Sequence, residues 1–125
     1  MNQSQPSRVA VAGLGAIGLK VAKALDAGLP GLSLVAVAGR DRERTRGQVA
    51  GLKSKPQVLA SGQLAEGADI IVDCAPSAAF AALAKSAVEA GRLLVSVNAG
   101  ALLRHRDLID RAAQTGARII VPTGA

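Results

Sequence analysis

Short apolar runs alternate with longer segments of helical periodicity, and this alternation restricts the possible folds more than any other feature. Apolar strands are predicted at residues 8–12, 34–38, 58–60, 69–74, 93–97 and 118–121. Helices are predicted at residues 16–27, 41–52, 77–90 and 102–115. Parallel strands need long crossover connections, so this alternation indicates a parallel sheet covered on both faces. Right-handed crossovers then predict an α/β fold with a doubly wound, six-stranded sheet in the order 3-2-1-4-5-6.

The composition supports one self-sufficient domain. Of the 125 residues, 50% are hydrophobic, so the chain can bury a core without a disulfide or a metal ion. Residues 8–125 are expected to form the domain, after a disordered N-terminal segment at residues 1–7. The start of the chain is polar and no apolar run approaches the ~20 residues of a membrane span. With one cysteine and no secretory signal, the sequence predicts a cytoplasmic protein with no membrane partner.

The net charge of +6 raises the possibility of nucleic-acid binding. The basic residues are spread along the chain, however, and the dense group at residues 40–46 is interleaved with acidic residues. Phe80 is the one aromatic residue, whereas base stacking needs aromatic side chains. We therefore expect no nucleic-acid partner. The alternative of a basic nucleic-acid-binding domain predicts steep salt dependence and no effect of NADP.

Three glycines match the pattern G-x-G-x-x-G between the first predicted strand and the first predicted helix. Gly13 would form the tight turn, Gly15 would let a pyrophosphate approach the backbone, and Gly18 would allow close packing of helix on strand. The N–H groups of Ala16 and Ile17, at the start of the helix, would face the phosphates. The sequence thus predicts a dinucleotide site within a Rossmann fold.

The end of the second strand indicates which dinucleotide is preferred. An acidic residue about 20 positions beyond the glycines would bind the ribose 2′-hydroxyl of NAD. Gly39 stands there instead, and Arg40 follows it. A guanidinium pairs well with a 2′-phosphate, so NADP is favoured over NAD. Asp41 leaves room for use of both cofactors, and the other arginines of the next helix are interpreted as its solvated face.

Ligands of such sheets bind beyond the carboxyl ends of the strands. Segments of small residues are predicted there at 74–77, 98–101 and 122–125. Ser77 is interpreted as a helix cap, Cys74 as a core residue and His105 as a surface residue. The sequence contains no recognisable metal-ligand cluster or catalytic triad, so we assign no catalytic residue and no metal site. It shows a cofactor half-site without a substrate half-site.

Four segments together resemble the L-aspartate dehydrogenases: residues 13–18, 73–76, 96–102 and 121–125. The resemblance implies a two-domain oxidoreductase whose N-terminal domain binds NAD or NADP. The second domain would bind L-aspartate and supply a catalytic histidine. Hydride transfer from the α-carbon would give iminoaspartate, which hydrolyses to oxaloacetate or feeds NAD biosynthesis. The resemblance also implies cofactor contacts at Ala75, Pro76, Asn98, Ala99 and Ala125, and a homodimer for the full-length protein.

The sequence is also compatible with two other functions. Homoserine dehydrogenases and the glucose–fructose oxidoreductase type share the sheet and the glycine motif, so this could be the cofactor domain of another two-domain dehydrogenase. A stand-alone nucleotide-sensing module is the interpretation if the chain is complete at Ala125. The segment from Asn98 to Ala101 carries one more small residue than the family's Ser-x-Gly-Ala-Leu form. The substrate domain is expected to be absent from this sequence, so the chain alone should bind cofactor without turnover.

Overall fold

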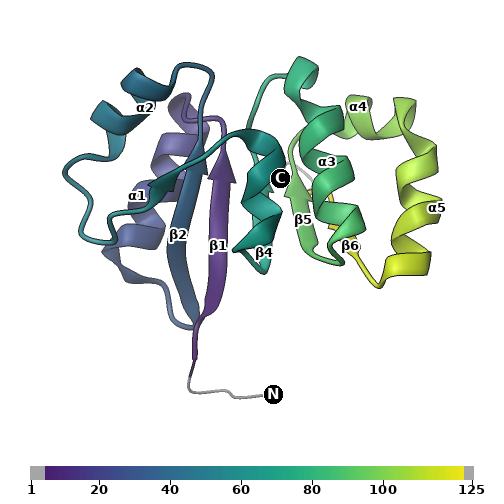
Figure 1. Cartoon of the computed structure of the whole chain (residues 1–125), viewed down its shortest axis with the longest axis horizontal. Coiled ribbons are helices and arrows are strands. Elements are labelled where there is room, and N and C mark those ends of the chain that lie inside the picture. Colours follow the sequence, from purple (N-terminus) through teal and green to yellow (C-terminus); the bar gives the residue numbers. More distant parts are fainter. Residues whose placement is uncertain (1–4, 123–125) are drawn as a thin grey trace.

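The computed structural model describes residues 5–122, which form a parallel sheet flanked by helices (Figure 1). The strands are β1 (Ser7–Ala12), β2 (Leu32–Ala38), β3 (Gln57–Val58), β4 (Ile70–Asp73), β5 (Leu93–Ser96) and β6 (Arg118–Ile120). The α-helices are α1 (Ala16–Gly28), α2 (Arg42–Val49), α3 (Phe80–Glu89), α4 (Ala99–Arg104) and α5 (Arg106–Thr115). Two 3₁₀ helices, η1 (Ser61–Glu66) and η2 (Ser77–Ala79), complete the elements.

The six strands are ordered β3-β2-β1-β4-β5-β6, and each neighbouring pair is parallel. This confirms the predicted doubly wound sheet. The chain moves outward from β1 to β3 and then returns to place β4 beside β1 on the opposite side. The connections from β1 and β4 therefore diverge at the carboxyl edge of the sheet, and ligands of open α/β sheets bind in the crevice that such a reversal creates.

Side chains alternate between the two faces of the central strands, as the period of a β-strand requires. On one face, Val9 and Val11 of β1 are buried in a cluster with Leu25 of α1 and Val49 of α2. These helices cover one face of the sheet over β1 and β2. This packing fixes the start of α1 and the start of α2 at the carboxyl edge.

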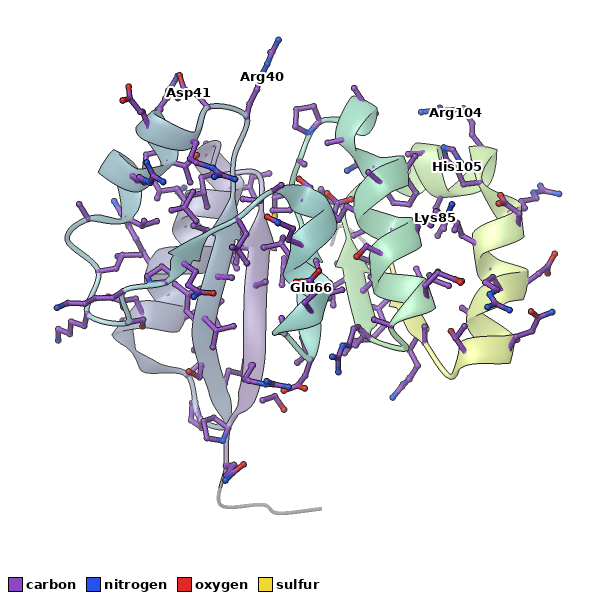
Figure 2. The ribbon with its side chains drawn as sticks, in the orientation of Figure 1. Arg40, Asp41, Glu66, Lys85, Arg104 and His105 are labelled. Atoms are coloured by element: carbon purple, nitrogen blue, oxygen red, sulfur yellow. The ribbon has the colours of Figure 1, made fainter. Side chains whose placement is uncertain are left out.

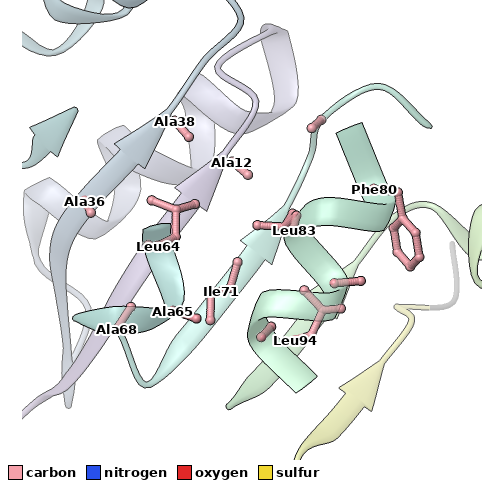
Figure 3. Packing of buried hydrophobic residues seen from close by; sticks show 14 of the residues in the cluster. Ala12, Ala36, Ala38, Leu64, Ala65, Ala68, Ile71, Phe80, Leu83 and Leu94 are labelled. Carbon is pink, nitrogen blue, oxygen red and sulfur yellow. The ribbon is translucent and has the colours of Figure 1, made fainter. Parts of the chain in front are cut away.

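The opposite face carries small side chains, and Figure 3 shows larger ones packed over them. Ala12, Ala36 and Ala38 are buried on β1 and β2. Their size lets η1 and α3 approach the sheet closely, where Leu64 and Leu83 fill the space with almost no exposure. Phe80 is the one aromatic side chain in this cluster, and close backbone packing fills the rest of the core.

Residues 102–115, which the sequence pattern predicts as one helix, form parts of two helices, so this prediction is wrong. α4 ends at Arg104 and α5 begins at Arg106, with His105 between them at φ −127° and ψ 52°. His105 is half-buried rather than at the surface, and its ring lies 5.7 Å from that of Phe80 between centroids. A contact between residues so far apart in sequence leaves no trace in the helical periodicity. None of the helices in residues 5–122 has the length and hydropathy needed to cross a membrane.

Candidate functional site

A cleft of about 1020 Å³ opens at the carboxyl edge, between the turn after β1, the start of α2 and the segment after β4. The sequence-predicted residues that line it are Gly13, Gly15, Gly39, Arg40, Ala75 and Pro76. A neighbouring hollow of about 370 Å³ shares part of this lining and is closed on its other side by Ala78 and Ala79. Residues from three separate strand ends are thereby brought to one place.

The turn after β1 depends on Gly13 for two reasons. Its φ of +85° lies in the left-handed region, which side chains other than glycine rarely adopt. A Cβ added at Gly13 would also lie 2.6 Å from backbone atoms of Ala75, so β1 and the segment after β4 approach too closely for any side chain. The Gly13 N–H donates to the Ala38 carbonyl at 2.7 Å, which ties the turn to the end of β2.

Gly18 and Gly15 have opposite surroundings. A Cβ at buried Gly18 would overlap the carbonyl oxygen of Gly13, so the glycine allows α1 to pack against the turn. A Cβ at Gly15 would meet none of the described atoms within 4 Å. The space in front of Gly15 is therefore open, as the approach of a pyrophosphate requires.

The start of α1 lies beside this open space. Gly15 is the N-cap and provides no side-chain cap, and the first turn contains no acidic residue. Ala16 and Ile17 follow it and are exposed. The first N–H groups of a helix lack partners within the helix and attract anions. The turn therefore fits a dinucleotide pyrophosphate.

Gln48 of α2 fixes the position of this turn, a role that sequence reasoning missed. Its Nε2 donates to the carbonyl oxygen of Leu14 at 2.9 Å. Leu14 is buried between the first two motif glycines, and both residues line the cleft. No local pattern marks Gln48, because its partner lies on a different element.

The end of β2 carries the positive side of the cleft. Figure 2 shows Arg40 and Asp41 beside each other at this edge, with Arg40 extended away from the sheet. Asp41 caps α2 by accepting from the Arg44 N–H at 3.2 Å, so this oxygen is directed at the helix. Arg42 and Arg44, expected only on a solvated helix face, are exposed but also line the cleft. Within residues 5–122 no carboxylate forms an ion pair with Arg40.

Asp73 is the central polar residue at the end of β4, and it was not selected as a site residue from the sequence. It is fully buried and accepts hydrogen bonds from the Ser96 hydroxyl at 2.8 Å, Asn98 Nδ2 at 2.9 Å and the Ala75 N–H at 3.0 Å. These bonds join the ends of β4 and β5. An acidic residue closing the otherwise apolar run Ile70–Val72 was the available signal.

Asn98 belongs to the same network. Its Nδ2 also donates to the Ala75 carbonyl at 2.8 Å, and its Oδ1 faces the Ser77 hydroxyl at 3.4 Å. Ser77 thus contacts Asn98 instead of capping a helix, contrary to the sequence prediction. Ala99 is exposed at the start of α4 and lines neither hollow, and Ala125 lies outside the described residues.

The remaining polar chemistry of the cleft suits binding better than proton transfer. Cys74, half-buried in the cleft wall, has its thiol pKa raised by burial and by the neighbouring Asp73. A thiol held in its protonated form is a poor nucleophile. His105 lies beyond α3 from Arg40 (Figure 2). The described residues include no group of three or more His, Cys, Asp or Glu side chains placed to hold a metal ion.

Comparison with known protein families identifies the family to which this chain belongs. The model described as "Homoserine dehydrogenase, NAD binding domain" matches residues 13–122, from the first motif glycine to the last described residue. The chain belongs to this family. It is thus a dinucleotide-binding domain of the homoserine dehydrogenase type.

Curated relatives confirm the resemblance to L-aspartate dehydrogenases. An L-aspartate dehydrogenase of Bradyrhizobium diazoefficiens is 52% identical over 98% of this chain and 43% of its own length. L-aspartate dehydrogenase 3 of Bordetella bronchiseptica is 37% identical over 100% of this chain and 46% of its own length. The NAD-binding domain therefore spans less than half the length of these relatives. A homoserine dehydrogenase structure from Thiobacillus denitrificans has a TM-score of 0.75 at 19% identity, covers 94% of this chain and 29% of its own, and shows the shared fold.

Proposed function

We propose that this chain is the cofactor-binding part of an L-aspartate dehydrogenase that oxidises L-aspartate with NADP in preference to NAD. The 52% identity to the Bradyrhizobium diazoefficiens enzyme, over 98% of this chain, carries the proposal. The cleft supports it, because its residues fit the parts of a dinucleotide. A homoserine dehydrogenase is the second candidate, favoured by the family model alone. No comparison favours the glucose–fructose oxidoreductase type that the sequence left open.

The proposed binding roles follow the geometry of the cleft. The N–H groups of Ala16 and Ile17 hold the pyrophosphate over the open face of Gly15. Ala75 and Pro76, which line both hollows, flank the cofactor. The bound nicotinamide supplies a hydride acceptor. Asn98 and Ala99 are proposed to lie near that ring, with Asn98 held in place by the Asp73 network. Ala125, outside the described residues, stays a predicted cofactor contact.

The preference for NADP rests on the end of β2. Gly39 offers no carboxylate to repel a 2′-phosphate, and Arg40 beside it has no ion-pair partner within residues 5–122. Arg42 and Arg44 border the same cleft and add positive charge. Guanidinium groups pair with phosphate through two parallel hydrogen bonds, which favours the phosphorylated ribose.

Substrate binding and the catalytic histidine are assigned to the part of the relatives that this chain does not span. The polypeptide alone is therefore proposed to bind dinucleotide without dehydrogenase activity. A homodimer and a cytoplasmic location stay expectations for the full-length protein. A stand-alone nucleotide-sensing module would show the same binding but would not complement a substrate domain.

A chimera tests the proposed function. Residues 1–122 would replace the matching part of the Bradyrhizobium diazoefficiens enzyme, whose remaining part is retained, and reduction of NADP with L-aspartate would be followed by absorbance. We expect turnover with L-aspartate and none from residues 1–125 alone. A matched chimera with Gly15→Val should lose turnover. A folded, cofactor-binding chimera that is inactive with L-aspartate would contradict the proposal, and so would aspartate-dependent reduction by the chain alone.

A further inference from the structure

We propose that Thr45 determines cofactor specificity by excluding any side chain from position 39. The inference rests on the proposed NADP preference and names a further residue that contributes to this preference. Position 39 is where an acidic side chain would bind the ribose hydroxyls of NAD. Thr45, one turn into α2, occupies the space that such a side chain needs.

Glycine is required at position 39 by the space around it and not by its backbone conformation. A Cβ built on Gly39 would overlap Oγ1 of Thr45 and would lie 3.2 Å from its Cβ and 3.4 Å from its Cγ2. Gly39 is absent from the glycines of the described chain that have positive φ, so its backbone would suit other residues. The neighbouring threonine is therefore what requires glycine here.

Thr45 is held firmly in this position. Its side chain is almost completely buried, with a residue exposure of 2%. Its hydroxyl donates to the Asp41 carbonyl at 2.7 Å, which ties it to the N-cap residue of α2. A rotation of the Thr45 side chain that turned both γ atoms away from position 39 would break this bond. The Thr45 Cβ would still lie closer to a Cβ at position 39 than an ordinary van der Waals contact allows.

The contact between Gly39 and Thr45 determines which substitutions can change the preference for NADP. An aspartate placed at residue 39 would displace Thr45 and with it the first turn of α2, which carries Arg42 and Arg44. Removing the γ atoms of Thr45 would open the space for that side chain. A change of preference to NAD therefore needs substitutions at both positions.

Stability measurements test the contact without reference to any cofactor. We would introduce Gly39→Ala into the wild-type, Thr45→Ala and Thr45→Ser backgrounds and follow thermal unfolding by circular dichroism. Gly39→Ala should lower the melting temperature by about 5–10 °C in the wild-type and Thr45→Ser backgrounds, since serine keeps the hydroxyl. In the Thr45→Ala background the same substitution should have less than half this effect. Equal effects in all three backgrounds would overturn the inference.

Binding measurements test the specificity role. The double variant Gly39→Asp/Thr45→Ala should have a ratio of NAD affinity to NADP affinity at least about tenfold above that of wild type, as measured by titration calorimetry. Gly39→Asp/Thr45→Ser is the matched control and should bind both cofactors poorly. An unchanged ratio in a folded Thr45→Ala double variant would overturn the specificity role. A wild-type chain that binds NAD more tightly would contradict the proposed NADP preference alone, because the stability coupling would remain.

Discussion

Replacing Asp73 by alanine removes the acceptor that joins the ends of β4 and β5. Three donors lose this acceptor: the Ser96 hydroxyl, the Ala75 N–H and Asn98 Nδ2, of which Asn98 Nδ2 keeps its second bond to the Ala75 carbonyl. Within the described residues every buried side-chain polar atom has a hydrogen-bond partner, so this network is fully satisfied in the native protein. The substitution would leave buried donors without acceptors, which is among the costliest changes in a protein core.

The magnitude follows from the burial of each donor. Ser96 is fully buried and Ala75 nearly so, and each unsatisfied donor there costs about 1–3 kcal/mol. Asn98 is half-buried, so water can replace part of its lost bond. The free energy of unfolding should therefore fall by about 3–5 kcal/mol, a large share of the ~5–15 kcal/mol typical of a domain. Ser96→Ala removes one donor to Asp73 and also the acceptor of the half-buried Asn98 N–H, while Asp73 keeps two donors, so it should cost about 1–2 kcal/mol.

Urea unfolding followed by far-ultraviolet circular dichroism measures both effects, since the chain has no Trp or Tyr for fluorescence. We expect the midpoint of Asp73→Ala to fall well below that of Ser96→Ala, with a similar slope. A loss below about 1 kcal/mol for Asp73→Ala would refute the reasoning, because it would show that the three donors find other partners.

The remaining predictions concern the glycine turn and acid stability. Gly15→Val should abolish binding of both NAD and NADP in calorimetry with little change in melting temperature, since its Cβ meets no described atom within 4 Å. Gly18→Ala should instead lower the melting temperature by about 5 °C or more, because its Cβ overlaps the Gly13 carbonyl. Hydrogen bonds and ion pairing with Arg8 lower the pKa of Asp69, so their stabilisation is present at neutral pH and lost as the pH falls below about 3.9. Asp69→Asn should therefore lower the melting temperature at pH 7 and flatten its decline between pH 5 and 3; an unchanged decline would contradict this assignment.

Local patterns were sufficient to predict the sheet and the position of the turn. Alternating apolar strands and helices determine the strand order, because crossover connections have one hand. Gly13 and Gly18 could be placed because the turn at Gly13 and the packing of Gly18 against the Gly13 carbonyl are both local, whereas the approach of Gly13 to Ala75 is not. The strand order and the close packing at these glycines agree with the prediction.

Contacts between distant elements could not be predicted in the same way. Gln48 reaches Leu14 across two elements, and Asp73 receives its donors from the next strand. The steric link between Gly39 and Thr45 joins a strand end to the side of a helix. Such contacts depend on how helices settle on the sheet, which periodicity does not specify. The break at His105 has the same origin, since its ring packs against Phe80 of α3.

Calorimetric titration of residues 1–125 with NADP and with NAD tests the central claim most directly. We expect both cofactors to bind and NADP to bind more tightly. Arg40→Ala should weaken the affinity for NADP by at least about tenfold and leave the affinity for NAD nearly unchanged. Binding of neither cofactor to the folded chain, or tighter binding of NAD by the wild type, would contradict this claim.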